Sequence, residues 1–372
     1  MRQTSTVSVV LRASGRAARG PAQLGTWPRL VCVVAIVLAT GVPSGVQSQP
    51  DPRRHHHSVN IVPFVEDGEQ KYYLSWSSSH AEEWEHDIYA EVVYFNRQGE
   101  LVVDRPAWRF VGTGDDGAQE PVSVALAPRG DVLLSTWEDG TDLSVGVDVR
   151  GQLHTPGGRI LRRNFQIAGG PDAQHSPAAA HCGGFFLVAY ADEAPPAQYA
   201  TVLVKVLDAS TGSVRQTLRL TSDSDDNWWP VVASDGRRHA LVGWGNGKSF
   251  SASLLRLEGD SFVVSGPWEV LDHVDQYYYG VRWIEPFQRF LVVARYGGAS
   301  QFCWIDMSGV PSGYARLPAP VTRETRFAVI DQPASRTCLV AYTTGRGEVA
   351  LVRSSPDSTR LLQRLSPETH PK

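Results

Sequence analysis

A short strand motif recurs along this chain and decides its fold. Its first copy is Tyr73-Leu74-Ser75-Trp76 and its last is Leu339-Val340-Ala341-Tyr342. Four further copies lie between them: Leu134-Ser135-Thr136-Trp137, Leu187-Val188-Ala189-Tyr190, Leu241-Val242-Gly243-Trp244 and Val292-Val293-Ala294-Arg295. The last residues of successive copies are 61, 53, 54, 51 and 47 residues apart. Apolar, β-branched and aromatic residues in such runs favour buried β-strands.

Each copy belongs to a larger unit of four predicted strands. In the third unit a strand at Pro177–Ala180 precedes the motif, a third strand follows at Thr201–Leu207, and a fourth covers Gln216–Thr221. Turns rich in Gly, Asp and Asn separate the strands. A period of about 50 residues made of strands alone is typical of propeller blades. The sequence therefore predicts an all-β β-propeller of about six four-stranded antiparallel blades, with a seven-bladed or irregularly closed ring as the alternative.

The first unit also resembles a known repeat. Lys71–Trp76, Asp87–Val93 and Gly99–Val102 are similar to the P-x-V-A, Y-L-V-x-W-x-D and D-I-Y-x-x-x-V repeats of secreted bacterial β-propeller proteins. The resemblance covers about residues 58–366. It implies a propeller and a setting outside the cell, and for most members of the group it implies no defined activity. Arg295 departs from the pattern where an aromatic residue is expected, and the last unit lacks the acidic residue, so closure of the ring can be irregular there.

The N-terminal region differs in composition from the rest of the chain. Residues 1–48 contain several Arg residues and no Asp or Glu, and they include a short apolar run, Leu30–Val42. This length is typical of a signal peptide and short for a transmembrane helix. We therefore expect a signal peptide at 1–48, with an uncleaved membrane anchor as the alternative. Residues 49–57 are predicted to be a flexible basic, His-containing mature N-terminus, 58–366 a single propeller domain, and 367–372 a C-terminal tail.

The bulk composition excludes some partners. The formal net charge is −4 and the isoelectric point is about 6.3. A general nucleic-acid binder needs a basic face, so no nucleic-acid partner is expected. No membrane contact is expected once the signal peptide is cleaved. The pattern leaves the oligomeric state open.

The cysteines and acidic residues give little evidence of disulfide bonds or bound cofactors. The three cysteines beyond the leader are odd in number and widely spaced, and Cys303 with Cys338 is the one pairing that neighbouring blades would favour. No cofactor is predicted. Calcium is the one metal that the sequence hints at, because Asp223, Asp225, Asp226 and Asn227 supply oxygen ligands, although not with the spacing of a known calcium loop.

The segments that lead into the first strand of each unit carry the candidate site. In a propeller these segments converge at one end of the central channel, and here they contain aromatic, acidic and basic residues. The candidate ligand-binding residues are Glu120, His175, Trp228, Trp229, Tyr277, Tyr278, Tyr279 and Arg326. Side chains alternate along a strand. We therefore expect one ring of the Trp228–Trp229 pair, and one or two of the three tyrosines, to face the channel, while the remaining rings pack between blades.

These residues favour a binding function over catalysis. Aromatic rings stack on the apolar faces of sugars, and carboxylates accept hydrogen bonds from hydroxyls. No catalytic motif is present. The sequence thus predicts a secreted or periplasmic binding or scaffold module for a glycan or an extracellular partner protein. The alternatives are a carbohydrate-active enzyme, which would need a pair of carboxylates across the channel, and a structural element of a cell-surface assembly.

Overall fold

The computed structural model describes ten stretches and one single residue of the 372-residue chain. They are residues 55–79, 86–110, 119, 122–140, 146–193, 199–222, 226–275, 278–318, 328–332, 337–343 and 349–365. The expected signal peptide at 1–48 and the C-terminal tail at 367–372 lie outside these residues.

The described residues form six four-stranded antiparallel sheets, and each sheet uses four consecutive strands. Blade 1 comprises β1 (His55–Glu66), β2 (Glu69–Ser79), β3 (His86–Phe95) and β4 (Leu101–Arg109). Blade 2 comprises β5 (Ser123–Leu126), β6 (Leu133–Asp139), β7 (Asp148–His154) and β8 (Ile160–Ala168). Blade 3 comprises β9 (Gln174–Cys182), β10 (Phe185–Asp192), β11 (Thr201–Asp208) and β12 (Val214–Arg219).

The second half of the chain repeats the same plan. Blade 4 comprises β13 (Trp228–Ser234), β14 (His239–Gly245), β15 (Ser249–Glu258) and β16 (Ser261–Asp272). Blade 5 comprises β17 (Tyr279–Ile284), the 3-10 turn η1 (Glu285–Phe287), β18 (Arg289–Tyr296), β19 (Ala299–Ile305) and β20 (Pro311–Leu317). Blade 6 comprises β21 (Ala328–Gln332), β22 (Thr337–Thr343), β23 (Val349–Ser355) and β24 (Ser358–Leu365).

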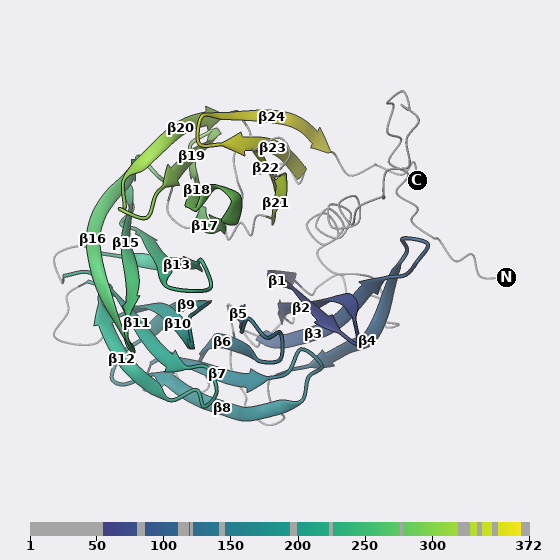
Figure 1. The fold of residues 1–372 in the computed structure, drawn as a ribbon. Helices are drawn as coiled ribbons and strands as arrows, with labels where there is room; N and C mark the ends of the chain where they lie inside the picture. Colours follow the sequence, from purple (N-terminus) through teal and green to yellow (C-terminus); the bar gives the residue numbers. More distant parts are fainter. Residues whose placement is uncertain are drawn as a thin grey trace.

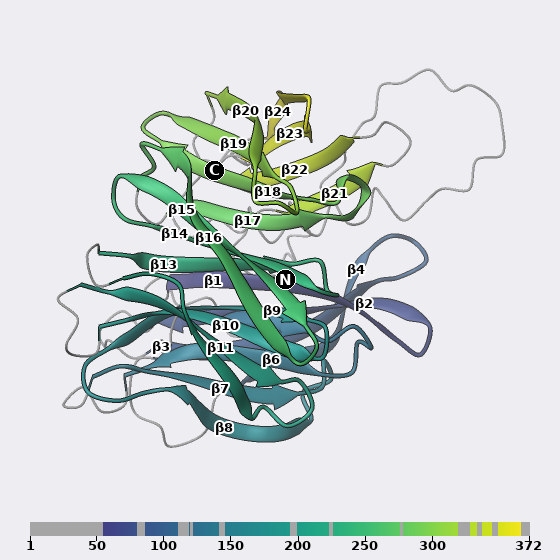
Figure 2. The same cartoon turned by 60° about the vertical axis from the view of Figure 1, so that its left-hand side comes forward.

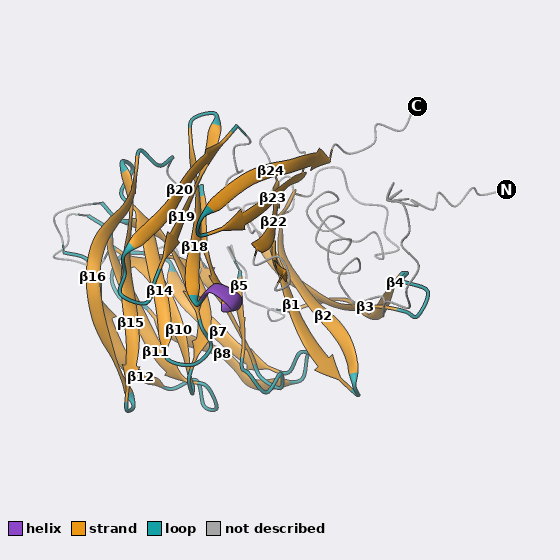
Figure 3. Cartoon of the chain, turned by 45° about the horizontal axis from the view of Figure 1, so that its top comes forward, coloured by secondary structure: helices purple, strands orange, loops and turns teal. Residues whose placement is uncertain are grey.

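The six sheets follow one another around a ring in the order of the sequence (Figures 1 and 2). The first strand of each blade lies innermost and the fourth strand lies on the outer rim (Figure 1). Within the described residues, η1 is the only helical turn (Figure 3). The predicted six-bladed β-propeller is therefore confirmed, and the described residues form six blades.

The core of the ring lies between neighbouring blades. A cluster of buried apolar residues fills each junction from blades 1 and 2 to blades 5 and 6. The motif strands are buried as expected, and their aromatic side chains are at most 4% exposed: Trp76, Trp137, Tyr190, Trp244 and Tyr342. Buried rings of this size each remove on the order of 150–250 Å² from water, which makes them the main contacts that hold one blade against the next.

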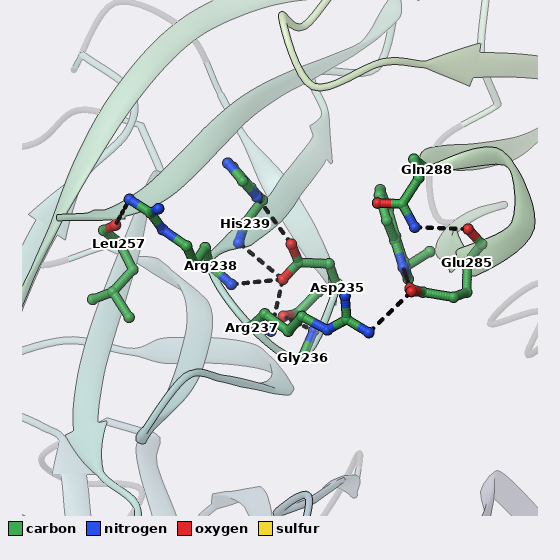
Figure 4. Close-up of polar contacts among 10 residues, drawn as sticks. Asp235, Gly236, Arg237, Arg238, His239, Leu257, Glu285 and Gln288 are labelled. Carbon is green, nitrogen blue, oxygen red and sulfur yellow. Dashed lines mark hydrogen bonds and ion pairs between the residues drawn. The ribbon is translucent and has the colours of Figure 1, made fainter.

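Asp and Asn side chains fix the tight turns within blades. In the β13–β14 turn, Asp235 Oδ1 accepts hydrogen bonds from the backbone N–H groups of Arg237, Arg238 and His239 at 2.7, 2.8 and 2.9 Å (Figure 4). Its Oδ2 lies 2.9 Å from His239 Nδ1. An Asp in this position closes a turn because its carboxylate replaces the missing backbone acceptors.

Two details differ from the sequence-based expectations. β1 begins at His55 and pairs with β2 from that residue, so His55–His57 belong to a strand and not to a flexible N-terminus. Cys303 and Cys338 are both buried and form no disulfide bond. Cys303 faces the junction of blades 4 and 5, whereas Cys338 faces the junction of blades 5 and 6, so the sheet of blade 5 separates the two thiols.

Candidate functional site

The described parts of the segments that lead into the first strand of each blade lie at one face of the ring. In blade 4, Trp228 at the start of β13 pairs with Gly245 at the end of β14, and Gly245 pairs with Phe250 near the start of β15. The starts of first and third strands therefore lie at the same face as the links between blades. We call this the link face. The inner strands β9 and β13 contact each other, which brings the starts of blades 3 and 4 together.

Matching bulges distort the inner strands β9 and β13 at this face. Ser176 and Trp229 have φ values of 55° and 53°, and each precedes a proline. The strand register shifts at both positions. Non-glycine residues at positive φ cost on the order of 1–3 kcal/mol and tend to occur at functional sites. The bulges also break the simple alternation of side chains, so neighbouring residues do not divide between the two sheet faces as an ideal strand requires.

The bulges place His175 in a cluster with residues from three blades. His175 Nδ1 lies 3.6 Å from Glu138 Oε2 of blade 2, and its Nε2 lies 3.9 Å from Glu193 Oε2 at the end of β10. The Trp228 ring of blade 4 tilts against the imidazole with a centroid separation of 5.6 Å. The backbone N–H of Ser176 donates to Glu138 Oε1. We call His175, Glu138, Glu193 and Trp228 the His175 cluster.

The cluster favours a protonated histidine. Burial alone lowers the pKa of His175, but the carboxylates of Glu138 and Glu193 outweigh it and raise the pKa above its ordinary value. When His175 is protonated, its imidazolium lies between the carboxylates of Glu138 and Glu193. The cluster is partly open to solvent, since the Glu193 and His175 side chains are 37% and 25% exposed.

The tandem aromatic residues separate into different environments. Trp229 packs against the core between blades 4 and 5. Tyr279 is buried, and its hydroxyl accepts a hydrogen bond from Gly245 N at 2.8 Å and donates to Trp228 O at 2.9 Å. Tyr279 therefore supports the backbone behind Trp228 and does not present its ring at the surface. Of this pair, Trp228 contacts His175, whereas Trp229 packs against the core between blades 4 and 5.

Tyr278 instead lines a hollow at the junction of blades 4 and 5. The hollow has a volume of about 700 Å³. Its lining includes Lys248, Glu269, Asp272, His273, Tyr278 and Tyr296. The β14–β15 turn, the end of β16, the link to β17 and the end of β18 supply these residues, so the hollow opens on the link face. We call it the blade 4–5 hollow.

Stacked cations hold the two tyrosines of the hollow. The Arg295 guanidinium lies over the Tyr278 ring at 4.4 Å, and Arg295 Nε lies 3.0 Å from Asp275 Oδ2. Tyr296 stacks on His273 with a centroid separation of 5.4 Å, and the Arg316 guanidinium lies 4.9 Å from its centroid. Arg295, which departs from the repeat motif, therefore orders the wall of the hollow. Stacked guanidinium groups keep such rings in one orientation.

The structure brings together only part of the predicted site. His175 and Trp228 contact each other, and Tyr278 lines the separate hollow. Trp229 is partly buried against the core between blades 4 and 5, and Tyr279 is buried. Glu120, Tyr277 and Arg326 lie outside the described residues. The sequence reasoning missed Tyr296, Glu269 and Lys248 of the hollow, together with Glu138 and Glu193 of the cluster. Tyr296 could have been noticed because it ends a motif strand directly before Gly297-Gly298.

A buried Ser–His pair lies between blades 1 and 2. Ser135 Oγ lies 3.0 Å from His154 Nε2, and His154 Nδ1 lies 2.9 Å from Thr155 O. Both side chains are completely buried. Burial lowers the pKa of His154 to about 4. A nucleophile needs access to its substrate, so this pair is a structural hydrogen bond of the blade junction.

The described residues contain neither a candidate metal site nor a helix that could span a membrane. No group of three or more His, Cys, Asp or Glu among them is arranged to hold a metal ion. Asp223 and Asp225 of the calcium hypothesis lie outside that part of the chain. Among the same residues, no helix has the length and apolar character needed to cross a membrane.

The similarity of this chain to known proteins concerns its fold alone. No protein-family model and no curated protein matches the chain. The hemagglutinin-neuraminidase of parainfluenza virus 5, solved with the ligand DANA, is 6% identical with a TM-score of 0.50, covering 84% of this chain and 89% of that one.

Two other solved structures are similar at a lower TM-score. The SapL1 lectin in complex with alpha methyl fucoside is 12% identical with a TM-score of 0.47, over 84% of this chain and 97% of that one. A putative 6-phosphogluconolactonase from Bacteroides fragilis is 12% identical with a TM-score of 0.48, over 82% of each chain. Identities this low carry no information about ligands, and by fold the chain is a β-propeller.

Proposed function

We propose that this protein is a carbohydrate-binding propeller and that the blade 4–5 hollow holds a neutral sugar residue. The observation that carries this proposal is the pairing of two tyrosine rings with carboxylates in one open hollow of about 700 Å³. Tyr296 is 38% exposed, so part of its surface is available to a ligand. Aromatic surface packs against the C–H faces of a sugar, while Glu269, Asp272 and Lys248 supply partners for its hydroxyl groups.

The charges of the hollow favour neutral over acidic sugars. Glu269 and Asp272 carry negative charge, and Asp275 is paired with Arg295. Among the residues that line the hollow, Lys248 opposes Glu269 and Asp272, so the lining carries an excess of negative charge, while Arg316 lies against Tyr296 and is not part of the lining. A sugar carboxylate or sulfate would meet this excess and lose affinity through like-charge repulsion.

A glycan array that contains neutral and acidic oligosaccharides tests the proposal. Wild-type protein should bind neutral members, and Tyr296→Ala should weaken binding by about fivefold, since contact with an aromatic ring contributes on the order of 1 kcal/mol. Tyr94→Ala in blade 1 is a matched control because Tyr94 is also partly buried and lies outside the hollow. Absence of glycan binding by the wild type, or equal binding by Tyr296→Ala, would overturn the proposal.

We also propose that the protein acts outside the cytoplasm. The basic leader and the short apolar run at Leu30–Val42 support export. N-terminal sequencing of protein recovered from an exporting host should find a chain that begins near Gln49. A mature chain that retains Leu30–Val42 would favour the membrane-anchored alternative.

A further inference from the structure

The His175 cluster and the blade 4–5 hollow are neighbours on the link face. Tyr278 lines the hollow, and the next residue, Tyr279, donates its hydroxyl to the carbonyl oxygen of Trp228 at 2.9 Å. The same hydroxyl accepts a hydrogen bond from Gly245 N at the end of β14. One buried tyrosine therefore connects the wall of the hollow to the backbone that carries the Trp228 ring.

The cluster has the groups that a second sugar residue would need. The Trp228 ring is partly exposed and lies beside the imidazole of His175. The Nε2 atom of His175 lies 3.9 Å from Glu193 Oε2, which is longer than a hydrogen bond. Both atoms can therefore bond a ligand hydroxyl without breaking a short contact. Glu193 is the most exposed acid of the cluster and is accessible for this purpose.

We propose that His175, Trp228 and Glu193 form a second sugar subsite, so that the ligand is an oligosaccharide extending from the blade 4–5 hollow toward the channel. Trp228 stacks on one sugar ring, Glu193 accepts a hydroxyl hydrogen, and the His175 imidazolium donates to a second oxygen of the ligand. Glu138 holds His175 in place from the other side. This inference rests on the proposed carbohydrate function.

Two linked subsites predict that the binding affinity depends on the number of sugar units in the oligosaccharide. Once one sugar occupies the hollow, the next units are held near the cluster at a high effective concentration. A ligand that reaches both subsites should therefore bind about a hundredfold more tightly than a single sugar. A ligand that contacts only the hollow gains no affinity from additional sugar units.

The test uses β-1,4-linked N-acetylglucosamine and glucose oligomers of one to six units as probes, together with the ligands found on the array. Calorimetry measures their affinity for the wild type, Trp228→Ala and Tyr296→Ala. Trp228→Ala should abolish the gain with length and leave the affinity for the single sugar unchanged, whereas Tyr296→Ala should weaken every probe. Trp283→Ala is the matched control, since Trp283 lies at the opposite end of β17 and bonds Glu285 at 2.6 Å.

His175→Gln and Glu193→Gln provide milder variants if Trp228→Ala does not fold. Each should reduce the gain with length about tenfold, because each removes a charge-assisted hydrogen bond to the ligand. In the wild type, NMR should show the His175 ring signals shifting with oligomers and not with the single sugar.

The outcomes separate the two proposals. Wild-type affinity that does not rise with chain length, with binding still lost in Tyr296→Ala, overturns the second subsite and leaves the hollow. A rise with length that survives in Trp228→Ala also overturns it. Failure of the wild type to bind any probe or array glycan removes the carbohydrate function, and the subsite with it.

Discussion

At the scale of single residues, burial of titratable groups controls how this protein responds to pH. His154 is completely enclosed between blades 1 and 2, and burial lowers its pKa to about 4. The unfolded chain takes up this proton near the ordinary histidine value of about 6.5. The native state is therefore fully favoured above pH 6.5 and loses stability as the pH falls toward 4.

We predict an acid-dependent loss of stability of about 3 kcal/mol from His154, following from a pKa difference of more than two units. Urea denaturation at pH 7.5, 6.0 and 4.5 measures it. His154→Gln should have lower stability at pH 7.5 and a weaker dependence on pH. His181, whose pKa burial also lowers to about 4, should account for part of the remaining dependence. Identical pH profiles of the wild type and His154→Gln would contradict the prediction.

The thiols give a second prediction at this scale. Burial raises the pKa of Cys303 to about 12 and that of Cys182 to about 11. Thiolates are the reactive form of cysteine, so both residues should be inert in the native state. A colorimetric thiol reagent at pH 8 should label Cys182, Cys303 and Cys338 only after denaturation. Rapid labelling of the native protein, or an unreactive pair after denaturation without reductant, would show an open or bridged site.

At the scale of strands and turns, much of the structure was predictable from the sequence. All the motif copies form the second strand of a blade, because short apolar runs that are rich in β-branched and aromatic residues and bounded by turns favour strands buried on both faces. The bulges at Ser176 and Trp229 were not predictable. Proline follows each of them, but a positive φ at a non-glycine residue depends on tertiary contacts such as the bond from Ser176 N to Glu138.

The candidate site was predictable only in its parts. The sequence indicated the aromatic lead-in segments but not which rings would be covered, since the bulges change the direction of successive side chains. Glu138 lies near the end of β6 and Glu193 directly follows β10, and nothing in the sequence distinguishes them from ordinary solvated acids. Their proximity to His175 arises from the packing of blades 2 and 3, which no local pattern encodes.

The turn between β13 and β14 gives a prediction at this scale. Asp235 accepts three backbone N–H groups and the His239 ring (Figure 4). Asp235→Ala should lower the free energy of unfolding by about 1 kcal/mol, because one carboxylate accepts three backbone N–H groups of the turn, and the two exposed donors, those of Arg237 and Arg238, can bond water in its place. Asp260→Ala in the exposed β15–β16 turn is the matched control and should change stability by less than about 0.5 kcal/mol. Chemical denaturation of the two variants measures the difference.

At the scale of the whole molecule, stability depends on contacts between successive blades. Every sheet uses four consecutive strands, so the first and last blades do not complete each other's sheets. Each blade presents an apolar face to its neighbour, and the junction of blades 5 and 6 buries Phe302 and Trp304 of blade 5 against Tyr342 and Val352 of blade 6. A blade without its neighbour would expose that face to water.

Removal of the last blade should therefore destabilise the entire ring and not only its end. A chain that stops at Pro318 would expose Phe302, Trp304 and Leu291, which are completely buried in the full chain. Burial of a large apolar side chain contributes on the order of 1.5–3 kcal/mol, so losing this junction removes a large share of the marginal stability of a single domain. The truncated chain should bind the dye ANS strongly and melt at least about 10 °C lower than the full chain.

A chain ending at Leu365 keeps all six sheets and should melt like the full protein. If the chain ending at Pro318 melted cooperatively at the wild-type temperature without binding ANS, five blades would form a complete unit and the sixth would be an appendage.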